Sequence, residues 1–289
     1  MSPVAAILER LQTGHINLSE LLMSEENPSV PVIEAIGLQK SYGHHQAVKG
    51  VDLVVRPGEI FGFLGPNGAG KTTTIKMLVG LLAPSAGVAR IGGHDIQKEP
   101  IQAKSLIGYV PDQPHLPDKL TAREYLRFIA GLYNLDRTAA RRRGEELLKL
   151  FALSDQADEL VGGYSHGMRQ KIVLAGALLH DPKVFFLDEP TVGLDPRSAR
   201  LIKDILRDLA GRGTAVFMST HILEIAERMC DRVAIIYDGR VIAIGTMEEL
   251  RTAQTAESLE DIFLKLTGGT DEKASGESSI KRGFENPEP

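Results

Sequence analysis

The sequence predicts an α/β protein whose main sheet is largely parallel. Beyond residue 60, short apolar runs alternate with stretches that have helical spacing, and this order is typical of strand–helix–strand units. The run at residues 184–187 is apolar without interruption, as expected for a parallel strand that is covered on both faces. A glycine-rich turn at residues 65–70 stands between one such strand and the helix after it. Because ligands of α/β sheets bind where strands end, this turn is the first candidate site.

The composition suits one large domain, or one domain with a subdomain. The chain has 289 residues, and 43% of them are hydrophobic. Its formal charge of −5 is concentrated at the two ends. Residues 1–31 carry four acidic side chains against one arginine, and residues 268–289 carry five against three basic ones, so residues 32–267 are neutral. The sequence therefore lacks the basic excess of a nucleic-acid-binding surface, and we expect no nucleic-acid partner.

The sequence also predicts neither a membrane span nor a disulfide. The longest apolar run, residues 172–179, is far shorter than the roughly 18 residues of a membrane span. No basic start precedes a hydrophobic segment, so we expect a soluble, cytosolic protein without a signal peptide. The single cysteine, Cys230, excludes internal disulfides and a zinc cluster of cysteines. We expect it to lie half-buried near a helix end.

The remaining elements follow from periodicity and turn residues. Residues 4–24 have roughly helical spacing, and residues 27–31 resemble a linker. The strands that we expect are residues 32–38, 47–55, 60–64, 88–91, 107–110, 184–187, 215–219, 233–237 and 240–244. The expected helices follow the glycine-rich turn and cover residues 121–160, a stretch ending at 179, and residues 197–210 and 221–230. Thr121 and Glu124 have capping-box spacing, Ser41-Tyr42-Gly43 is expected to be a loop, and Asp238-Gly239 is expected to be a hairpin turn.

The glycine-rich turn fits the G-x-x-x-x-G-K-[ST] pattern of a phosphate-binding loop. A strand, a glycine turn and a helix start aim several backbone N–H groups and the positive helix end at one point. We predict that Lys71 pairs with the β- and γ-phosphates of a bound nucleotide and takes part in catalysis, and that Thr72 ligates Mg²⁺. The candidate nucleotide-binding residues of the loop, which are ATP-binding under the resemblance described next, are Gly65, Pro66, Asn67, Gly68, Ala69, Gly70, Lys71, Thr72 and Thr73.

Several motifs in this order resemble the ABC-type ATPases, the nucleotide-binding subunits of ABC transporters. They are the phosphate loop, a second glycine-rich turn at residues 162–169 and the strand end Asp188-Glu189. The resemblance covers residues 32–245 and implies a P-loop NTPase (RecA-like) core with an antiparallel β subdomain and an α-helical subdomain. The helical subdomain would cover about residues 112–165. Outside the ATPase domain, residues 1–31 would be a leader and linker, 246–267 a C-terminal helical extension and 268–289 a disordered tail.

The resemblance also implies roles for single residues. Asp188 would hold Mg²⁺, usually through water, and Glu189 would polarise the attacking water. His221 matches the histidine that contacts the γ-phosphate and holds this water in line. Tyr42 matches the aromatic residue that stacks on adenine, and Gly193-Leu194-Asp195 resembles the D-loop of the family.

Two motifs depart from the family pattern. Its signature Leu-Ser-Gly-Gly-Gln reads Tyr164-Ser165-His166-Gly167-Met168 in this chain. Ser165 and Gly167 are retained and would supply a hydroxyl and a backbone N–H to a γ-phosphate, but we expect weaker nucleotide-driven dimerisation. Where the family has a glutamine that contacts Mg²⁺ and water, this chain has Asp112 followed by Gln113, and either could serve.

The function implied by the resemblance is ATP hydrolysis coupled to transport. Two such domains would dimerise head to tail around ATP, as a homodimer or with a homologue, and a separate integral membrane permease would be needed. We expect a subunit on the cytoplasmic face of the cell membrane, most similar to exporter subunits. The alternative is a soluble ABC ATPase acting on ribosomes or DNA. Such proteins usually carry two nucleotide domains or a long coiled coil, and the sequence contains neither.

Overall fold

The computed structural model describes residues 30–113, 115–190, 195–254 and 259–267 of the chain. Almost all of the expected leader and the whole expected tail lie outside these residues, as do Gly193 and Leu194 of the expected D-loop. In the described part, no helix is both long and apolar enough to cross a membrane.

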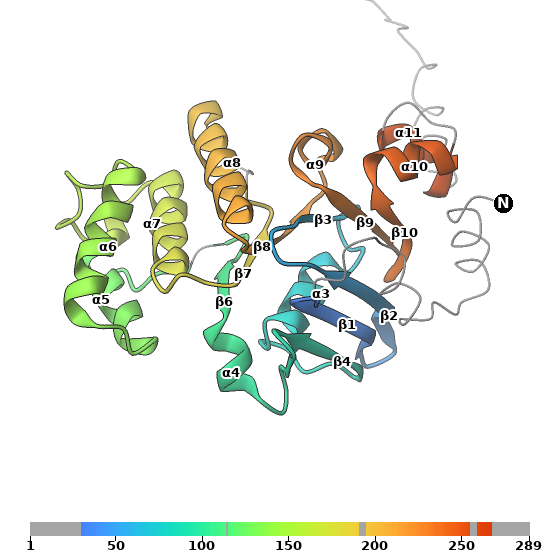
Figure 1. Ribbon diagram of the computed structural model, residues 1–289, viewed down its shortest axis with the longest axis horizontal. Coiled ribbons are helices and arrows are strands. Elements are labelled where there is room, and N and C mark those ends of the chain that lie inside the picture. The colour runs from blue at the N-terminus through green and yellow to red at the C-terminus, as the bar shows by residue number, and fades with distance from the viewer. Residues whose placement is uncertain (1–29, 114, 191–194, 255–258, 268–289) are drawn as a thin grey trace, which may run out of the picture.

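After β3 the strands of the larger sheet are separated by helices except at its antiparallel edge, as the sequence predicts (Figure 1). The strands are β1 (Ile33–Tyr42), β2 (His45–Val55), β3 (Ile60–Leu64), β4 (Ala86–Ile91), β5 (His94–Asp95), β6 (Ile107–Val110), β7 (Val184–Asp188), β8 (Ala215–Thr220), β9 (Arg232–Tyr237) and β10 (Arg240–Thr246). The helices are α3 (Lys71–Leu78), α4 (Pro100–Ser105), α5 (Ala122–Leu132), α6 (Arg137–Leu150), α7 (His166–Leu178), α8 (Pro196–Gly211), α9 (Leu223–Met229), α10 (Met247–Gln254) and α11 (Leu259–Thr267), with a short 3₁₀ turn η1 (Val161–Gly163).

The strands form two sheets, and their order brings three strand ends together. A four-stranded antiparallel sheet has the order β2-β1-β4-β5, and a six-stranded sheet has the order β10-β9-β3-β8-β7-β6. Within the larger sheet β3, β6, β7, β8 and β9 are parallel, and β10 joins the edge in the antiparallel sense. The carboxyl ends of β3, β8 and β7 therefore lie side by side, and the predicted α/β fold class is confirmed.

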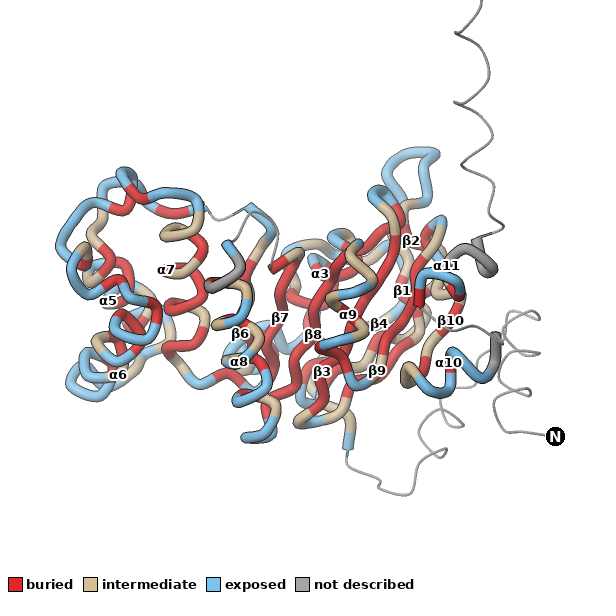
Figure 2. Tube along the Cα trace, turned by 90° about the horizontal axis from the view of Figure 1, so that it is seen from above, coloured by how far each residue is buried: buried red, intermediate tan, exposed pale blue. Residues whose placement is uncertain are grey.

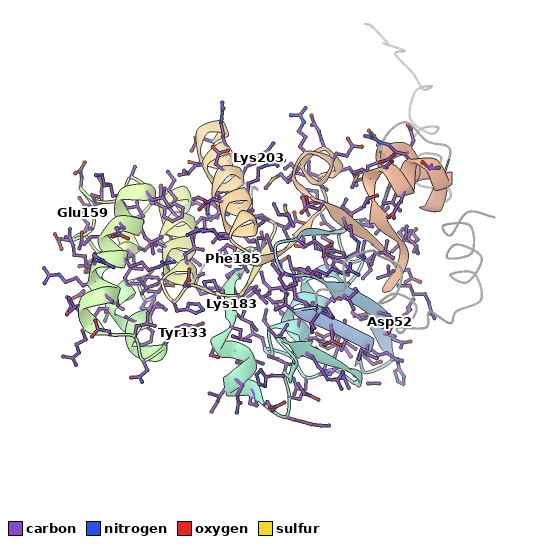
Figure 3. All side chains as sticks on the ribbon, viewed as in Figure 1. Asp52, Tyr133, Glu159, Lys183, Phe185 and Lys203 are labelled. Atoms are coloured by element: carbon purple, nitrogen blue, oxygen red, sulfur yellow. The ribbon has the colours of Figure 1, made fainter. Side chains whose placement is uncertain are left out.

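The central strands of the larger sheet, β3, β7 and β8, are buried and appear red in Figure 2. Every residue of β3, β7 and β8 is buried. Alternate side chains of β7 enter two different cores: Phe185 and Leu187 join the core with the helical subdomain, and Val184 and Phe186 join the core with the antiparallel sheet. Figure 3 shows Phe185 at the centre of the molecule. The expected parallel strand covered on both faces is thus confirmed.

The expected helical stretch at residues 121–160 contains two helices, α5 and α6, and its helical structure ends earlier than expected, at Leu150. The first, α5, begins with the predicted capping box, in which Thr121 and Glu124 exchange hydrogen bonds. It ends at Leu132, and Asn134 adopts a left-handed backbone with φ of 51°. The Asp136 side chain then caps α6 by accepting from the backbone N–H of Ala139 at 2.8 Å. In Figure 1 these helices and α7 lie at the end of the molecule opposite β2.

Three further expectations need correction. Ser41 and Tyr42 belong to β1 rather than to a loop, because Gly43 allows a tighter hairpin with φ of 58°. The expected helix at 221–230 starts only at Leu223, so His221 lies between β8 and α9. Cys230 is buried rather than half-buried, and burial raises the pKa of its thiol to about 12.

Candidate active site

The glycine-rich loop connects β3 to α3 and is closely enclosed by two neighbouring strands. A Cβ atom on Gly65 would lie 2.3 Å from the carbonyl oxygen of Ile236 on β9. A Cβ atom on Gly70 would lie 2.7 Å from the carbonyl oxygen of Ala47 on β2, and Gly70 also has a φ of 108°. Only glycine fits at these two positions, because backbone atoms cannot move aside as side chains do. The loop sequence is therefore explained by its own packing as well as by phosphate binding.

The side chain of Lys71 is hydrogen-bonded to the backbone of this loop. Its ammonium group donates hydrogen bonds to the carbonyl oxygens of Gly65 at 2.8 Å and Pro66 at 3.2 Å, and its side chain is only 6% exposed. The same nitrogen lies 3.4 Å from Oε1 of Glu189. The side chain thus presents a positive charge where the backbone N–H groups of α3 begin. Thr72 is exposed in the first turn of α3.

Two carboxylates follow each other at the end of β7 and have different surroundings. Asp188 is 1% exposed, and its Oδ1 accepts a hydrogen bond from the Ser219 hydroxyl on β8 at 2.5 Å. Its Oδ2 is buried and has no hydrogen-bond partner in the described part of the chain. Glu189 has a left-handed backbone with φ of 51°, and its N–H lies 3.2 Å from both oxygens of Ser219, the carbonyl and the hydroxyl.

Glu189 lies between a lysine and a histidine. Its Oε1 faces Lys71, and its Oε2 is 3.0 Å from Nδ1 of His221. The backbone N–H of His221 points to the same Oε2 at 3.4 Å. The glutamate side chain is 12% exposed and the histidine 42% exposed, so solvent reaches the cluster from the histidine side. The structure therefore brings together four of the predicted site residues, Lys71, Asp188, Glu189 and His221, from the ends of β3, β7 and β8.

The arrangement suits a magnesium ion that is bound partly by protein side chains and partly by phosphate oxygens. A buried carboxylate oxygen without a partner is costly, and a cation would satisfy it. Oδ2 of Asp188 is such an atom, and a threonine hydroxyl from Thr72 is the second predicted ligand. Among the described residues no group of three or more His, Cys, Asp or Glu side chains forms a metal cage. Mg²⁺ usually keeps waters and binds one or two protein ligands plus substrate phosphates, so one carboxylate and one hydroxyl are a suitable protein contribution.

Asp112 follows β6, and the charged side chains of the same cluster affect its pKa. Partial burial raises the pKa of Asp112, and the nearby carboxylates of Asp188 and Glu189 raise it further. The side chains of His166 and His221 act in the opposite direction on this pKa. Gln113 is exposed in the same loop.

The signature turn is part of the start of α7. Ser165 is the N-cap of this helix, and its exposed hydroxyl accepts from the backbone N–H of Met168 at 3.4 Å. Tyr164, which stands where the family has leucine, is buried and donates its hydroxyl to the carbonyl oxygen of Gln156 at 2.6 Å. In the described residues no hydrogen bond or ion pair joins Ser165 or Gly167 to the cluster around Glu189.

Tyr42 ends β1 at the hairpin with β2. Its ring is 50% exposed, and the ammonium group of Lys40 lies 5.5 Å from the ring centroid. Its face on the solvent side can stack on a flat ligand. The structure gives it no contact with the carboxylate cluster in the described residues.

Ser219 is a site residue that the sequence reading missed. It belongs to the apolar strand β8, yet both Ser219 and its neighbour Thr220 are completely buried. Buried hydroxyls nearly always have hydrogen-bond partners. Two hydroxyl residues in a row at the end of an apolar strand were therefore a usable signal for a partner in the site.

Comparisons with known proteins agree with this geometry. The sequence profile of the family described as "ABC transporter" matches residues 48–192. The chain is 42% identical to daunorubicin resistance ATP-binding protein DrrA3 of Streptomyces coeruleorubidus, over 80% of this chain and 73% of that protein. It is 40% identical to ABC transporter ATP-binding protein NatA of Bacillus subtilis, over 78% and 92% of the two chains. It is also 40% identical to Nod factor export ATP-binding protein I of Paraburkholderia xenovorans, over 80% and 76%.

Solved structures show the same fold. An ATP-binding subunit of an ABC transporter superposes with a TM-score of 0.78 and 34% identity, over 82% of this chain and 99% of that one. A dimeric ATP-binding cassette in a post-hydrolysis state, bound to ADP and Pi, superposes with a TM-score of 0.69 and 27% identity, over 74% and 98%.

Proposed function

The chain belongs to the ABC transporter family as an ATP-binding subunit, and from this premise we propose that it hydrolyses ATP to drive an exporter with a separate membrane permease. The family and its post-hydrolysis dimer support ATP hydrolysis. The outward direction is supported by two similar proteins, whose names refer to daunorubicin resistance and to Nod factor export. The observation that carries the chemistry is Glu189 held between Lys71 and His221.

Each residue of the cluster would act on the γ-phosphate or on the water that attacks it. The backbone of the loop at residues 65–73 would bind the phosphates, and Lys71 would neutralise their charge. Glu189 would accept a hydrogen bond from the water, and His221 would hold Glu189 and the γ-phosphate in position. Mg²⁺, held by Asp188 and Thr72, would neutralise charge that develops on the phosphate oxygens. The adenine ring would stack on Tyr42.

A second nucleotide-binding subunit would complete the site. Ser165 and Gly167 are exposed or half-exposed at the start of α7 and have no contact with the carboxylates of their own chain in the described residues. In a head-to-tail dimer they would donate to the γ-phosphate bound by the other subunit. That subunit would be a second copy of this chain or a homologue.

The permease would contact the junction between the helical subdomain and the core. A cavity of about 210 Å³ opens there between the end of α3, β6, α5 and α7. It is mainly apolar, and exposed Leu81 stands at its edge. Phe128 and Leu132 on α5 and Ile101 on α4 are also exposed large apolar residues. Exposed apolar groups are typical of a protein contact, so Leu81 at the cavity edge and these three residues are the candidates for contact with a permease.

ATPase assays and co-purification test the two parts of this proposal separately. Lys71→Ala should abolish ATP hydrolysis, whereas Lys76→Ala, an exposed lysine of the same helix, should leave it unchanged. Equal activity of the two variants would contradict the site. The tagged protein should co-purify with a multi-span membrane protein from detergent-solubilised membranes. Recovery with ribosomes or DNA, and with no membrane protein, would instead support the soluble alternative.

A further inference from the structure

The side chain of Gln170 on α7 is buried and only half satisfied. It is 3% exposed, and its Nε2 donates to the carbonyl oxygen of Pro190 at 2.8 Å. Its Oε1 is buried without a hydrogen-bond partner in the described residues. Leaving an amide oxygen unpaired in the interior costs free energy, so packing alone does not explain a glutamine at this position. An apolar side chain of the same length would fill the space without that cost.

The residue that Gln170 binds follows directly after Glu189. A non-glycine residue with a left-handed backbone is strained, and it keeps this conformation only when its surroundings fix it. The N–H of Glu189 is fixed by Ser219 on β8, and the next carbonyl, that of Pro190, is fixed by Gln170 on α7. The backbone that aims Glu189 is therefore held from two different elements.

The helix that carries Gln170 also carries the signature turn. Ser165 caps α7, and Gln170 lies within the first two turns after it. Because a helix moves as a stiff rod, a displacement of its first turn also moves the Gln170 amide. We propose that Gln170 is a positioning residue that transmits engagement of the signature turn by the second subunit's ATP to the orientation of Glu189 in its own site. This inference rests on the proposed head-to-tail dimer.

The consequence is a direct link between the two ATP sites of the dimer. ATP in one site contacts the signature turn of the opposite subunit, and α7 with Gln170 then acts on Glu189 of that subunit. Positive cooperativity in ATP hydrolysis follows, because each ATP favours the active orientation in the other site.

The test replaces Gln170 by a side chain of similar shape that has no hydrogen-bond donor. Gln170→Met should lower kcat about tenfold, with KM changed less than about twofold, since small misplacements of a catalytic group are this costly. It should also remove cooperativity in ATP, while thermal stability stays close to that of the original protein. Lys171→Met, the next residue on the same helix, is the matched control and should change neither quantity.

A second variant distinguishes positioning from packing. In Gln170→Glu the buried carboxyl group has a raised pKa, and its protonated form can donate to Pro190 as the amide does. The activity of this variant relative to the original protein should therefore rise as the pH falls. A role in packing alone would give a ratio that does not rise toward acid pH.

The outcomes separate this inference from the proposed function. If the original protein is cooperative and Lys71→Ala is inactive, but Gln170→Met retains kcat and cooperativity, the inference is wrong and the ATPase site stands. If the original protein hydrolyses ATP without cooperativity and remains monomeric with ATP, the proposed dimer fails and the inference fails with it.

Discussion

The hydroxyl of Ser219 contacts both carboxylate residues of the site. It donates to Oδ1 of Asp188 and lies 3.2 Å from the backbone N–H of Glu189. Ser219→Ala should lower kcat about tenfold, because groups that orient a metal ligand or a catalytic carboxylate typically contribute a factor of ten to a hundred. Steady-state ATPase assays at saturating ATP measure this effect.

A buried hydroxyl at the opposite end of the same strand provides the control. Thr214 immediately precedes β8, is 8% exposed and donates to the carbonyl oxygen of Pro182 at 3.2 Å. Thr214→Val should lower stability by about 1 kcal/mol, as the loss of one buried hydrogen bond does, and should leave kcat unchanged. If Ser219→Ala and Thr214→Val have equal effects on kcat, Ser219 has no specific role in the site.

The sequence predicted the residues of the cluster better than their contacts. Lys71, Asp188 and Glu189 could be identified because each stands at a fixed offset from a strand end. The strained backbone of Glu189 could not be predicted, because it depends on Ser219 about thirty residues later and on Gln170 about twenty residues earlier. Hydrogen bonds between distant elements leave no periodic pattern in a sequence, so neither Ser219 nor Gln170 was singled out.

The loop after β6 contains two candidates for contact with the proposed magnesium ion. Asp112 is close enough to Asp188 and Glu189 for their charges to raise its pKa, and a divalent cation would relieve this repulsion between carboxylates. We therefore expect Asp112→Ala to weaken the apparent Mg²⁺ affinity in ATPase assays by about tenfold. Gln113→Ala, the neighbouring exposed residue, should have little effect. The reverse order of the two variants would assign the role to Gln113.

The contact between α5 and the segment after α7 should make stability depend on pH. The His180 ring stacks on Tyr133 with centroids 3.7 Å apart, and its Nε2 hydrogen-bonds to the carbonyl oxygen of Ile107. Tyr133 lies at this junction in Figure 3. Burial lowers the pKa of His180 to about 4. Between this value and the ordinary pKa near 6.5, the unfolded chain binds a proton that the folded chain does not, so the stability falls as the pH falls.

A phenylalanine variant measures this contribution. His180→Phe keeps an aromatic ring against Tyr133 and removes the titrating group. Between pH 7 and pH 5 the free energy of unfolding should fall by about 1 kcal/mol more in the original protein than in His180→Phe, after allowance for partial solvent exposure. Urea unfolding at both pH values gives the two differences. Equal losses would show that folding does not change the pKa of His180.

Continuous apolar patterns predicted strands and helices well, whereas the break between two helices was harder to predict. The expected strand at residues 60–64 coincides with β3, because apolar residues fill it and turn residues bound it. The stretch at 121–160 was predicted to be helical without a division into two helices, since its apolar spacing continues through the break. The break depends on the left-handed Asn134 and on the Asp136 cap, which are single-residue signals within a helical composition.

The order of strands across the larger sheet could be inferred only from the family resemblance. Periodicity shows that a strand is buried on both faces, but it does not show which strand pairs with it. In the structure β3 lies between β8 and β9, which are separated from it by more than 150 residues. This order determines the site, since it brings the loop after β3 next to Glu189 and His221. The domain boundaries at residues 31, 245 and 267 remain predictions.

The unusual signature turn should weaken the ATP-bound dimer. Glu189→Gln should bind ATP without hydrolysing it, which allows the dimer to accumulate. His166 and Met168 replace a glycine and a glutamine of the family pattern, so the turn loses a polar side chain and gains bulk beside the phosphate. We expect the Glu189→Gln dimer to be weak in sedimentation velocity with ATP and Mg²⁺. Adding His166→Gly and Met168→Gln should strengthen it about tenfold, the effect of roughly one hydrogen bond.

The same experiment includes its own control, because the dimer must depend on nucleotide. Lys71→Ala in the Glu189→Gln background should remain monomeric at every ATP concentration, since the ammonium group that faces the phosphates is gone. A tight dimer of Glu189→Gln with its natural signature turn would contradict the expectation of weak dimerisation. In that case Ser165 and Gly167 would be sufficient to hold the second subunit's ATP without the glycine and glutamine that His166 and Met168 replace. That result would also strengthen the case for α7 as the element that connects the two sites, because a firmly held signature turn would act more strongly on Gln170.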